Sequence, residues 1–162
     1  MTHAGRPSVD PSTSADYVAL PAGCMVGRYE IVSVLGHGGF GITYRARDRY
    51  LDREVALKEF LPAVLAVRQD GGSVLPRSTE AAGDFGWGRG RFMEEGRTLA
   101  SLPEAPSIVK VFDFLEASGT AYIVMELVRG RTLQDYVETE GPLVPAALEA
   151  MLWPLLAGLQ KV

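Results

Sequence analysis

The pattern of apolar and polar residues along the chain predicts five β-strands. Aromatic and β-branched residues fill positions 29–35, and they return at 42–44 after a cluster of glycines. A polar turn precedes a third apolar run at 54–60, which favours a three-stranded meander. Two later runs, 108–115 and 121–128, are joined by a turn of hairpin length. We expect these segments to form one five-stranded antiparallel sheet.

Apolar residues at helical spacing predict three helices. Phe92 and Leu99 lie on one face of a helix from about 90 to 101, which a proline ends. A short helix at 133–138 precedes a longer one at 145–161, which prolines and a glutamate interrupt, so it is an amphipathic helix and not a membrane span. Its apolar stripe is wide enough to predict an exposed apolar surface, and comprises Leu148, Met151, Leu152, Leu155, Leu156 and Leu159.

The chain divides into three parts. Residues 1–24 are rich in Pro, Ser, Thr and Asp and lack the apolar core of a secretory signal, which indicates a disordered leader. The predicted sheet and first helix occupy 25–128, with an inserted segment at about 61–90. That segment suggests a short helix or hairpin, and the four glycines of its second half make it a poor regular element. The remaining helices occupy 129–162.

Composition and charge narrow the classes of partner. The 162 residues are 47% apolar and 22% charged, which suits one globular domain, and the net charge of −4 argues against nucleic acid or an anionic membrane as partner. Cys24 is the single cysteine and the histidines are His3 and His37, so neither an internal disulfide nor a Cys/His zinc site can form. We therefore expect a cytoplasmic location and no membrane segment.

Residues 36–41 match the pattern G-x-G-x-x-G, which is weak by itself because several phosphate-binding loops share it. A dinucleotide-binding Rossmann loop would open a helix directly after Gly41, whereas the residues that follow favour a strand. A glycine loop between antiparallel strands can lay backbone N–H groups over phosphates. An ordinary glycine hairpin explains the same residues equally well.

Two charged residues occupy positions where apolar side chains are expected. Strand alternation places Lys58 on the same face as Ala56 and Phe60, and Glu95 lies within the apolar stripe of the first helix. Taken singly, each is explained by a lysine that reaches water or by a solvated glutamate. Because an unpaired buried charge costs about 3–5 kcal/mol, the two together predict an ion pair between Lys58 and Glu95.

Five sequence motifs, taken in their order along the chain, resemble those of the bacterial Hanks-type serine/threonine protein kinases. The glycine loop, Val-Ala-x-Lys at 55–58, Phe-x-x-Glu at 92–95, Ile-Val at 108–109 and Tyr-Ile-Val-Met-Glu at 122–126 follow one another as in that family, from about residue 25 to 162. The resemblance implies an α+β fold: a kinase N-lobe, with a five-stranded antiparallel sheet and helix C, followed by the first helices of a truncated C-lobe.

The resemblance also implies roles for individual residues. Lys58 would hold the α- and β-phosphates of ATP, and Glu95 on helix C would position Lys58. Thr132 would lie near the ribose. The other residues that it assigns to ATP are the loop residues Gly36, Gly38, Gly39, Phe40 and Gly41, the pocket residues Leu35, Thr43, Ala56 and Val109, the gatekeeper Met125, and the hinge residues Glu126 and Val128.

The catalytic loop and the magnesium-binding motif of that family are absent from this sequence. No histidine follows His37, and the triplet Asp-Phe-Gly at 84–86 precedes the hinge, so it is not the metal motif. The intact enzyme is expected to transfer the γ-phosphate of ATP to serine or threonine of a protein substrate, with Mg²⁺ bound outside this chain. This chain alone is expected to be inactive, and the alternative is a truncated pseudokinase that acts as a protein-binding module.

Overall fold

A six-stranded antiparallel sheet forms the centre of the molecule. The computed structural model describes residues 19–69, 72–102 and 107–160. The strand order is β1-β2-β3-β4-β8-β7, so the five predicted strands pair as expected and a two-residue strand, β1, is added at one edge. The bounds are β1 Met25–Val26, β2 Tyr29–Gly38, β3 Gly41–Asp48, β4 Arg53–Phe60, β7 Val111–Ala117 and β8 Thr120–Met125.

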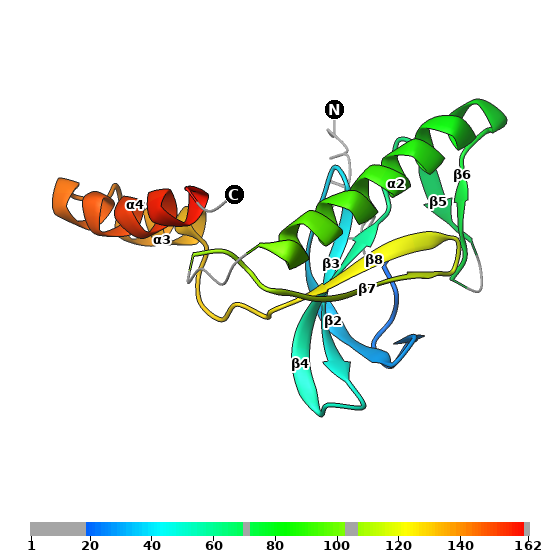
Figure 1. Cartoon of the computed structure of the whole chain (residues 1–162), viewed down its shortest axis with the longest axis horizontal. Helices are drawn as coiled ribbons and strands as arrows, with labels where there is room; N and C mark the ends of the chain where they lie inside the picture. Colours follow the sequence, from blue (N-terminus) through cyan, green and yellow to red (C-terminus); the bar gives the residue numbers. More distant parts are fainter. Residues whose placement is uncertain (1–18, 70–71, 103–106, 161–162) are drawn as a thin grey trace, which may run out of the picture.

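Helix α2, Thr79–Ser101, crosses one face of the sheet (Figure 1). It ends where the sequence predicts but begins at Thr79 instead of near residue 90, so the expectation of an irregular second half for the inserted segment is wrong. Ser78 caps the start, since its side chain accepts a hydrogen bond from the Ala81 backbone N–H at 3.2 Å. Packing against the sheet then offsets the low helix propensity of the glycines.

Phe60 of β4 explains why a glycine-rich stretch is helical. The rings of Phe85 and Phe92 flank the Phe60 ring, with centroid distances of 5.5 and 5.4 Å. Gly88 lies between them on the same helix face, and a Cβ there would come within 2.9 Å of the Phe60 ring. The missing side chain lets the helix approach the sheet closely. Phe85 is therefore a core residue, and the Asp-Phe-Gly triplet at 84–86 belongs to a helix.

Alanine substitution at two glycines of α2 tests this packing. Gly83 faces open space, so Gly83→Ala is expected to raise the free energy of unfolding by about 0.5–1 kcal/mol through helix propensity. Gly88→Ala makes the same local change but crowds a buried ring, which costs about 1–3 kcal/mol. In urea denaturation, the free energy of unfolding should be higher for Gly83→Ala than for wild type and lower for Gly88→Ala. Equal gains at both sites would contradict the close approach.

The first half of the inserted segment forms a hairpin of β5, Ala66–Arg68, and β6, Val74–Pro76. The hairpin is attached to the turn between β7 and β8, because the Val74 N–H donates to the Ser118 carbonyl at 2.7 Å. Gly119 in that turn has φ +80°, and a Cβ there would lie 2.4 Å from the Val74 carbonyl oxygen. Figure 1 shows the hairpin beside the N-terminal end of α2.

Residues 19–24, which composition assigns to a disordered leader, are ordered in the structure. Residues 1–18 lie outside the described residues, but 19–24 pack against the sheet. Leu20 is buried and its N–H donates to the Tyr44 hydroxyl at 3.1 Å, while the Ile31 N–H donates to the Cys24 carbonyl at 2.8 Å. An apolar side chain and satisfied backbone groups therefore fix this segment, which composition alone assigns to the leader.

The last two helices lie beyond the C-terminal end of α2 (Figure 1). Helix α3 spans Leu133–Glu140 and α4 spans Pro145–Leu159, with Pro154 inside α4. The predicted exposed apolar surface is present, since the leucines of α4 are 40–67% exposed. These are Leu148, Leu152, Leu155, Leu156 and Leu159. In the part of the chain that the structure describes, no helix is both long and apolar enough to span a membrane.

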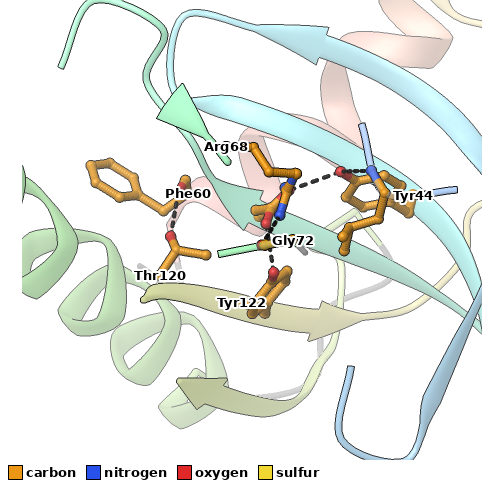
Figure 2. Close-up of polar contacts among 8 residues, drawn as sticks. Tyr44, Phe60, Arg68, Gly72, Thr120 and Tyr122 are labelled. Atoms are coloured by element: carbon orange, nitrogen blue, oxygen red, sulfur yellow. Dashed lines mark hydrogen bonds and ion pairs between the residues drawn. The ribbon is translucent and has the colours of Figure 1, made fainter. Parts of the chain in front are cut away.

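A buried polar cluster lies on the opposite face of β4 from Lys58. Glu59 is completely buried and accepts hydrogen bonds from the hydroxyls of Tyr44 at 2.8 Å and Tyr122 at 2.5 Å. Arg68 of β5 reaches the same carboxylate at 2.5 Å (Figure 2). The pKa values of Tyr44 and Tyr122 both lie above the ordinary tyrosine value. Burial is the largest cause, and the negative charge of Glu59 is the next. The hydroxyls therefore stay protonated and act as donors.

Candidate functional site

The glycine loop is a turn between two strands. β2 ends at Gly38 and β3 begins at Gly41, and these residues pair across the turn. A strand and not a helix follows Gly41, so the dinucleotide-loop alternative is wrong. The Leu61 N–H donates to the Phe40 carbonyl at 3.0 Å, which ties the loop to the end of β4. The loop is therefore a flap whose tip is attached to the end of β4, and the Phe40 side chain is exposed.

Only glycine fits at position 41. Its φ of +142° is a conformation that side chains rarely adopt, and a Cβ would lie 1.9 Å from the Glu59 carbonyl oxygen. By contrast, Cβ atoms added at Gly36, Gly38 or Gly39 would meet no atom within 4 Å. The glycines thus divide into one that the fold requires and three that leave the loop backbone accessible to a ligand.

Lys58 lies at the centre of the sheet and faces α2. It pairs with Thr43 on one side and Ile123 on the other, so the three side chains share one face. Its Nζ atom lies 5.6 Å from the centroid of the Phe92 ring. Together with the loop, Lys58 and Thr43 line a cavity of about 430 Å³, whose other lining residues are Leu35, Gly36, His37, Gly38, Gly39, Phe40 and Gly41.

The flap cavity brings the backbone of the glycine loop and the Lys58 side chain around one space. Lys58 is its only charged lining residue. His37 belongs to the same loop, but it pairs with Ile42, whose partner on β4 is Glu59, so alternation puts the His37 side chain on the face opposite to Lys58. This arrangement suits an anion, and a phosphate group has the acceptors that these donors require.

The predicted ion pair between Lys58 and Glu95 is absent from the described residues. Glu95 is exposed, and Glu94 pairs instead with Arg91 at 2.8 Å. Lys58 and Glu95 nevertheless line one cavity of about 970 Å³, which is continuous in its lining with the flap through Gly39, Phe40 and Lys58. The Phe92 ring lies next to the ammonium group and provides a cation–π contact in place of the carboxylate.

Close packing of α2 on the sheet fixes where Glu95 lies. A Cβ at the neighbouring Gly96 would come within 3.1 Å of the Ile123 side chain, so the helix backbone lies directly against β8 at this point. By helix propensity alone, a glycine at position 96 would weaken the helix. The structure shows the same residue buried at the contact between helix and sheet.

The residues assigned to adenine lie near the end of β8. Ala56 pairs with Met125, and both belong to adjacent central strands. The Glu126 N–H already donates to the Lys110 carbonyl at 2.8 Å, so the group that Glu126 has for a ligand is its carbonyl oxygen. Val128 is 72% exposed. None of these four assigned residues lines either of the two cavities described above.

Val109 and Thr132 complete the predicted set. Val109 is half-buried and lies before β7, which begins at Val111 and not at residue 108 as predicted. The Thr132 side chain caps α3: its hydroxyl accepts from the Asp135 N–H at 3.0 Å, and the Asp135 carboxylate accepts from the Thr132 N–H at 3.1 Å. Those hydrogen bonds lower the pKa of the Asp135 carboxyl. The Thr132 hydroxyl thus accepts a hydrogen bond within the chain.

Sequence reasoning misses the buried polar cluster on the opposite face of β4 from this site. Arg68 and the Tyr44–Glu59–Tyr122 contacts are not predicted, although a glutamate inside the apolar run 54–60 is a signal of a buried partner. Within the described ranges 19–69, 72–102 and 107–160, no cluster of three His, Cys, Asp or Glu side chains could hold a metal ion.

Comparison with known proteins identifies the family. The protein kinase domain family matches residues 29–162. The chain is 40% identical over 119 residues to the serine/threonine-protein kinase PrkC of Bacillus subtilis, and 41% identical over 122 residues to PknB of Mycobacterium tuberculosis. These matches cover 74% and 73% of this chain but only 15% and 16% of the two relatives. The chain therefore spans about a sixth of the length of each.

Solved structures agree with the sequence comparison. The apo form of PpkA-294 has a TM-score of 0.72 and 36% identity, and the match covers 76% of this chain and 43% of that one. The PknI kinase domain of Mycobacterium tuberculosis has a TM-score of 0.65 at 25% identity, covering 87% and 49%. With the curled antiparallel sheet, the glycine flap and the helix across the sheet already in place, the chain belongs to the protein kinase domain family, and its relatives are bacterial serine/threonine-protein kinases.

Proposed function

We propose that this chain is the ATP-binding part of a serine/threonine protein kinase. The observation that carries the proposal is the flap cavity, in which the glycine loop and Lys58 surround a space suited to phosphate. The intact enzyme transfers the γ-phosphate of ATP to a protein serine or threonine, as the names of the relatives imply for them. Membership of the family supports this activity, while the chain itself contributes nucleotide binding.

Each part of the site has a physical task in binding. The N–H groups of the flap donate to phosphate oxygens, and the Lys58 ammonium neutralises part of their charge. The Glu126 carbonyl and the backbone of Val128 hold the adenine edge. Magnesium neutralises phosphate charge in family enzymes when it is bound, but no described residues form a cluster that could hold it. The proposed role of this chain is therefore binding and not transfer.

The ion pair between Lys58 and Glu95 belongs to the active arrangement. Both side chains already line one cavity, so a shift of α2 that brings the Glu95 carboxylate past Phe92 to the ammonium would complete it. Such a pair holds the lysine in place for the phosphates. We expect nucleotide or the remainder of the enzyme to supply the free energy for this shift.

Purified residues 1–162 provide the test. We expect calorimetry to detect ADP binding and Lys58→Met to weaken it about 10- to 100-fold, the equivalent of one charge-assisted hydrogen bond. We also expect no transfer of labelled phosphate to a generic protein substrate, because the catalytic loop is absent from this sequence. Lys110→Met, outside both cavities, is the matched control and should bind ADP as wild type does. Transfer that Lys58→Met abolishes would overturn the proposal.

A second candidate is a pseudokinase that acts as a protein-binding module. The observation that favours it is the exposed leucine stripe of α4, because an apolar surface of that extent generally marks a partner. In this case ADP binding is dispensable, and Leu155→Glu with Leu159→Glu should abolish partner capture while Lys58→Met leaves it intact. The reading frame after codon 162 distinguishes the candidates, since a His-Arg-Asp motif there supports the enzyme.

A further inference from the structure

The cavity of about 970 Å³ extends well beyond the flap. Its far part lies between the start of α2 and the loop that joins β4 to β5, on the side away from the hinge residues. This volume is at the upper end of the range for ligand sites, and most of its lining is apolar. The glycine flap and Lys58 line one end only. The far part therefore needs a separate explanation.

The walls of this far part are built and held in place. Phe60 and Phe92 form a buried floor, with their rings 5.4 Å apart. The loop wall is attached to the residue before the α2 cap: the Arg77 N–H donates to the Leu65 carbonyl at 2.9 Å, and the Arg77 side chain donates to the Ala63 carbonyl at 2.5 Å. The groove is thus preformed and not a gap between loose segments.

The rim carries large apolar side chains that this chain leaves exposed. Val64 is 81% exposed, and Trp87 and Phe40 are each 72% exposed. All three line the same cavity, although they come from the β4–β5 loop, from α2 and from the flap. Trp is among the residues that most often contribute binding free energy at protein interfaces. Three such side chains around one groove favour an apolar anchor as its occupant.

Charge on the rim favours a basic occupant. Of the charged lining residues, Arg91 and Glu94 neutralise each other at 2.8 Å. Among the described residues, no ion pair or hydrogen bond engages the carboxylates of Asp84 and Glu95, and both are exposed. Asp84 lies three residues before Trp87 on α2, so a carboxylate and the indole share one helix face. Lys58 at the other end faces the flap cavity as well.

We propose that this groove binds a segment of another protein that presents an apolar side chain next to an arginine or lysine. The apolar side chain packs between Val64, Trp87 and the Phe60 ring, and the basic group meets Asp84. The groove is lined by α2, so an occupant contacts the helix that carries Glu95. This inference does not rest on nucleotide binding, since the far part of the groove shares no residue with the hinge.

Fluorescence of Trp87 reports on the groove directly. Trp153 is the other tryptophan, so Trp153→Phe leaves Trp87 as the single reporter in residues 1–162. The probes are capped six-residue peptides with a central Leu-Phe pair that is flanked by arginine, by glutamate or by serine, and a fourth in which serine replaces the pair and arginine flanks it. We expect the arginine-flanked Leu-Phe peptide to shift the Trp87 emission and to bind at least tenfold more tightly than the other three.

Variants assign the contacts. Val64→Ser should weaken binding of the arginine-flanked peptide about tenfold. Asp84→Asn should weaken that binding about threefold, and the variant protein should no longer prefer the arginine-flanked peptide to the serine-flanked one. Asp52→Asn, an exposed carboxylate on the β3–β4 turn, is the matched control and should change nothing. The arginine-flanked peptide should bind whether or not calorimetry detects ADP binding by the same protein, which separates this inference from the proposed function.

Three results would overturn the proposal. The first is equal binding of arginine- and glutamate-flanked peptides, which would leave Asp84 without a role. The second is an unchanged Trp87 emission with every peptide. The third is a change of Trp87 emission with protein concentration alone, which would identify a second copy of this chain as the occupant.

Discussion

Glu59→Ala is expected to lower the free energy of unfolding by about 3–5 kcal/mol, because removing one partner of a buried ion pair leaves the other charge uncompensated. Glu59 is fully buried and Arg68 nearly so. Burial lowers the pKa of Arg68, but the hydrogen bond and charge of Glu59 outweigh burial and raise it, so Arg68 remains a cation. Two tyrosine hydroxyls lose their acceptor at the same time. Urea denaturation measures the loss.

Matched variants separate the buried pair from charge in general. Glu30→Ala removes a carboxylate that pairs with Arg49 at the surface, and should cost less than about 1 kcal/mol. Glu59→Gln combined with Arg68→Met removes both charges and keeps an acceptor for the tyrosines, so it should recover most of the stability. A cost for Glu59→Ala no greater than that for Glu30→Ala would show that the cluster does not hold the hairpin on the sheet.

Gly41→Ala is expected to cost about 2–4 kcal/mol and to open the flap. The new Cβ would lie 1.9 Å from a backbone carbonyl oxygen, at a φ of +142° that alanine rarely adopts. The strained backbone costs about 1–3 kcal/mol, and loss of the hydrogen bond between Leu61 and Phe40 adds about 1 kcal/mol. Urea denaturation gives the change in stability, and calorimetry with ADP gives the change in flap function.

Gly38→Ala is the control for this effect. It changes a glycine in the same turn, but its Cβ would meet no atom within 4 Å. We expect no loss of stability from it, since the substitution only restricts the unfolded chain. If Gly38→Ala and Gly41→Ala destabilise the protein equally, then the loop is sensitive to any side chain and the close approach of Gly41 to β4 is not the reason.

The strands were predictable because their signal is local. Alternation of apolar residues over a few positions is enough to place a strand, and the five predicted strands belong to one antiparallel sheet as expected. The start of α2 was not predictable in the same way. Glycine lowers helix propensity wherever it occurs, whereas the benefit of Gly88 comes from the Phe60 ring, which is distant in sequence.

Whether Lys58 and Glu95 form an ion pair could not be predicted from the sequence either. Periodicity places each side chain on an inward face, and both do line one cavity. Whether they touch depends on how the helix packs on the sheet, which Gly96, Ile123 and Phe92 decide together. Likewise, Glu59 could be recognised as a buried charge, but its partner Arg68 lies in a hairpin that composition describes only as an insertion.

The most direct test of a nucleotide site formed by the flap and Lys58 is to identify which lysine lies beside the phosphates of a bound nucleotide. An acyl phosphate of ADP acylates amines close to its terminal phosphate, and the chain has three lysines, Lys58, Lys110 and Lys161. After brief treatment of residues 1–162, mass spectrometry should find the acyl group on Lys58, and an excess of ADP should prevent this labelling. Equal labelling of all three lysines, unchanged by ADP, would contradict a nucleotide site formed by the flap and Lys58.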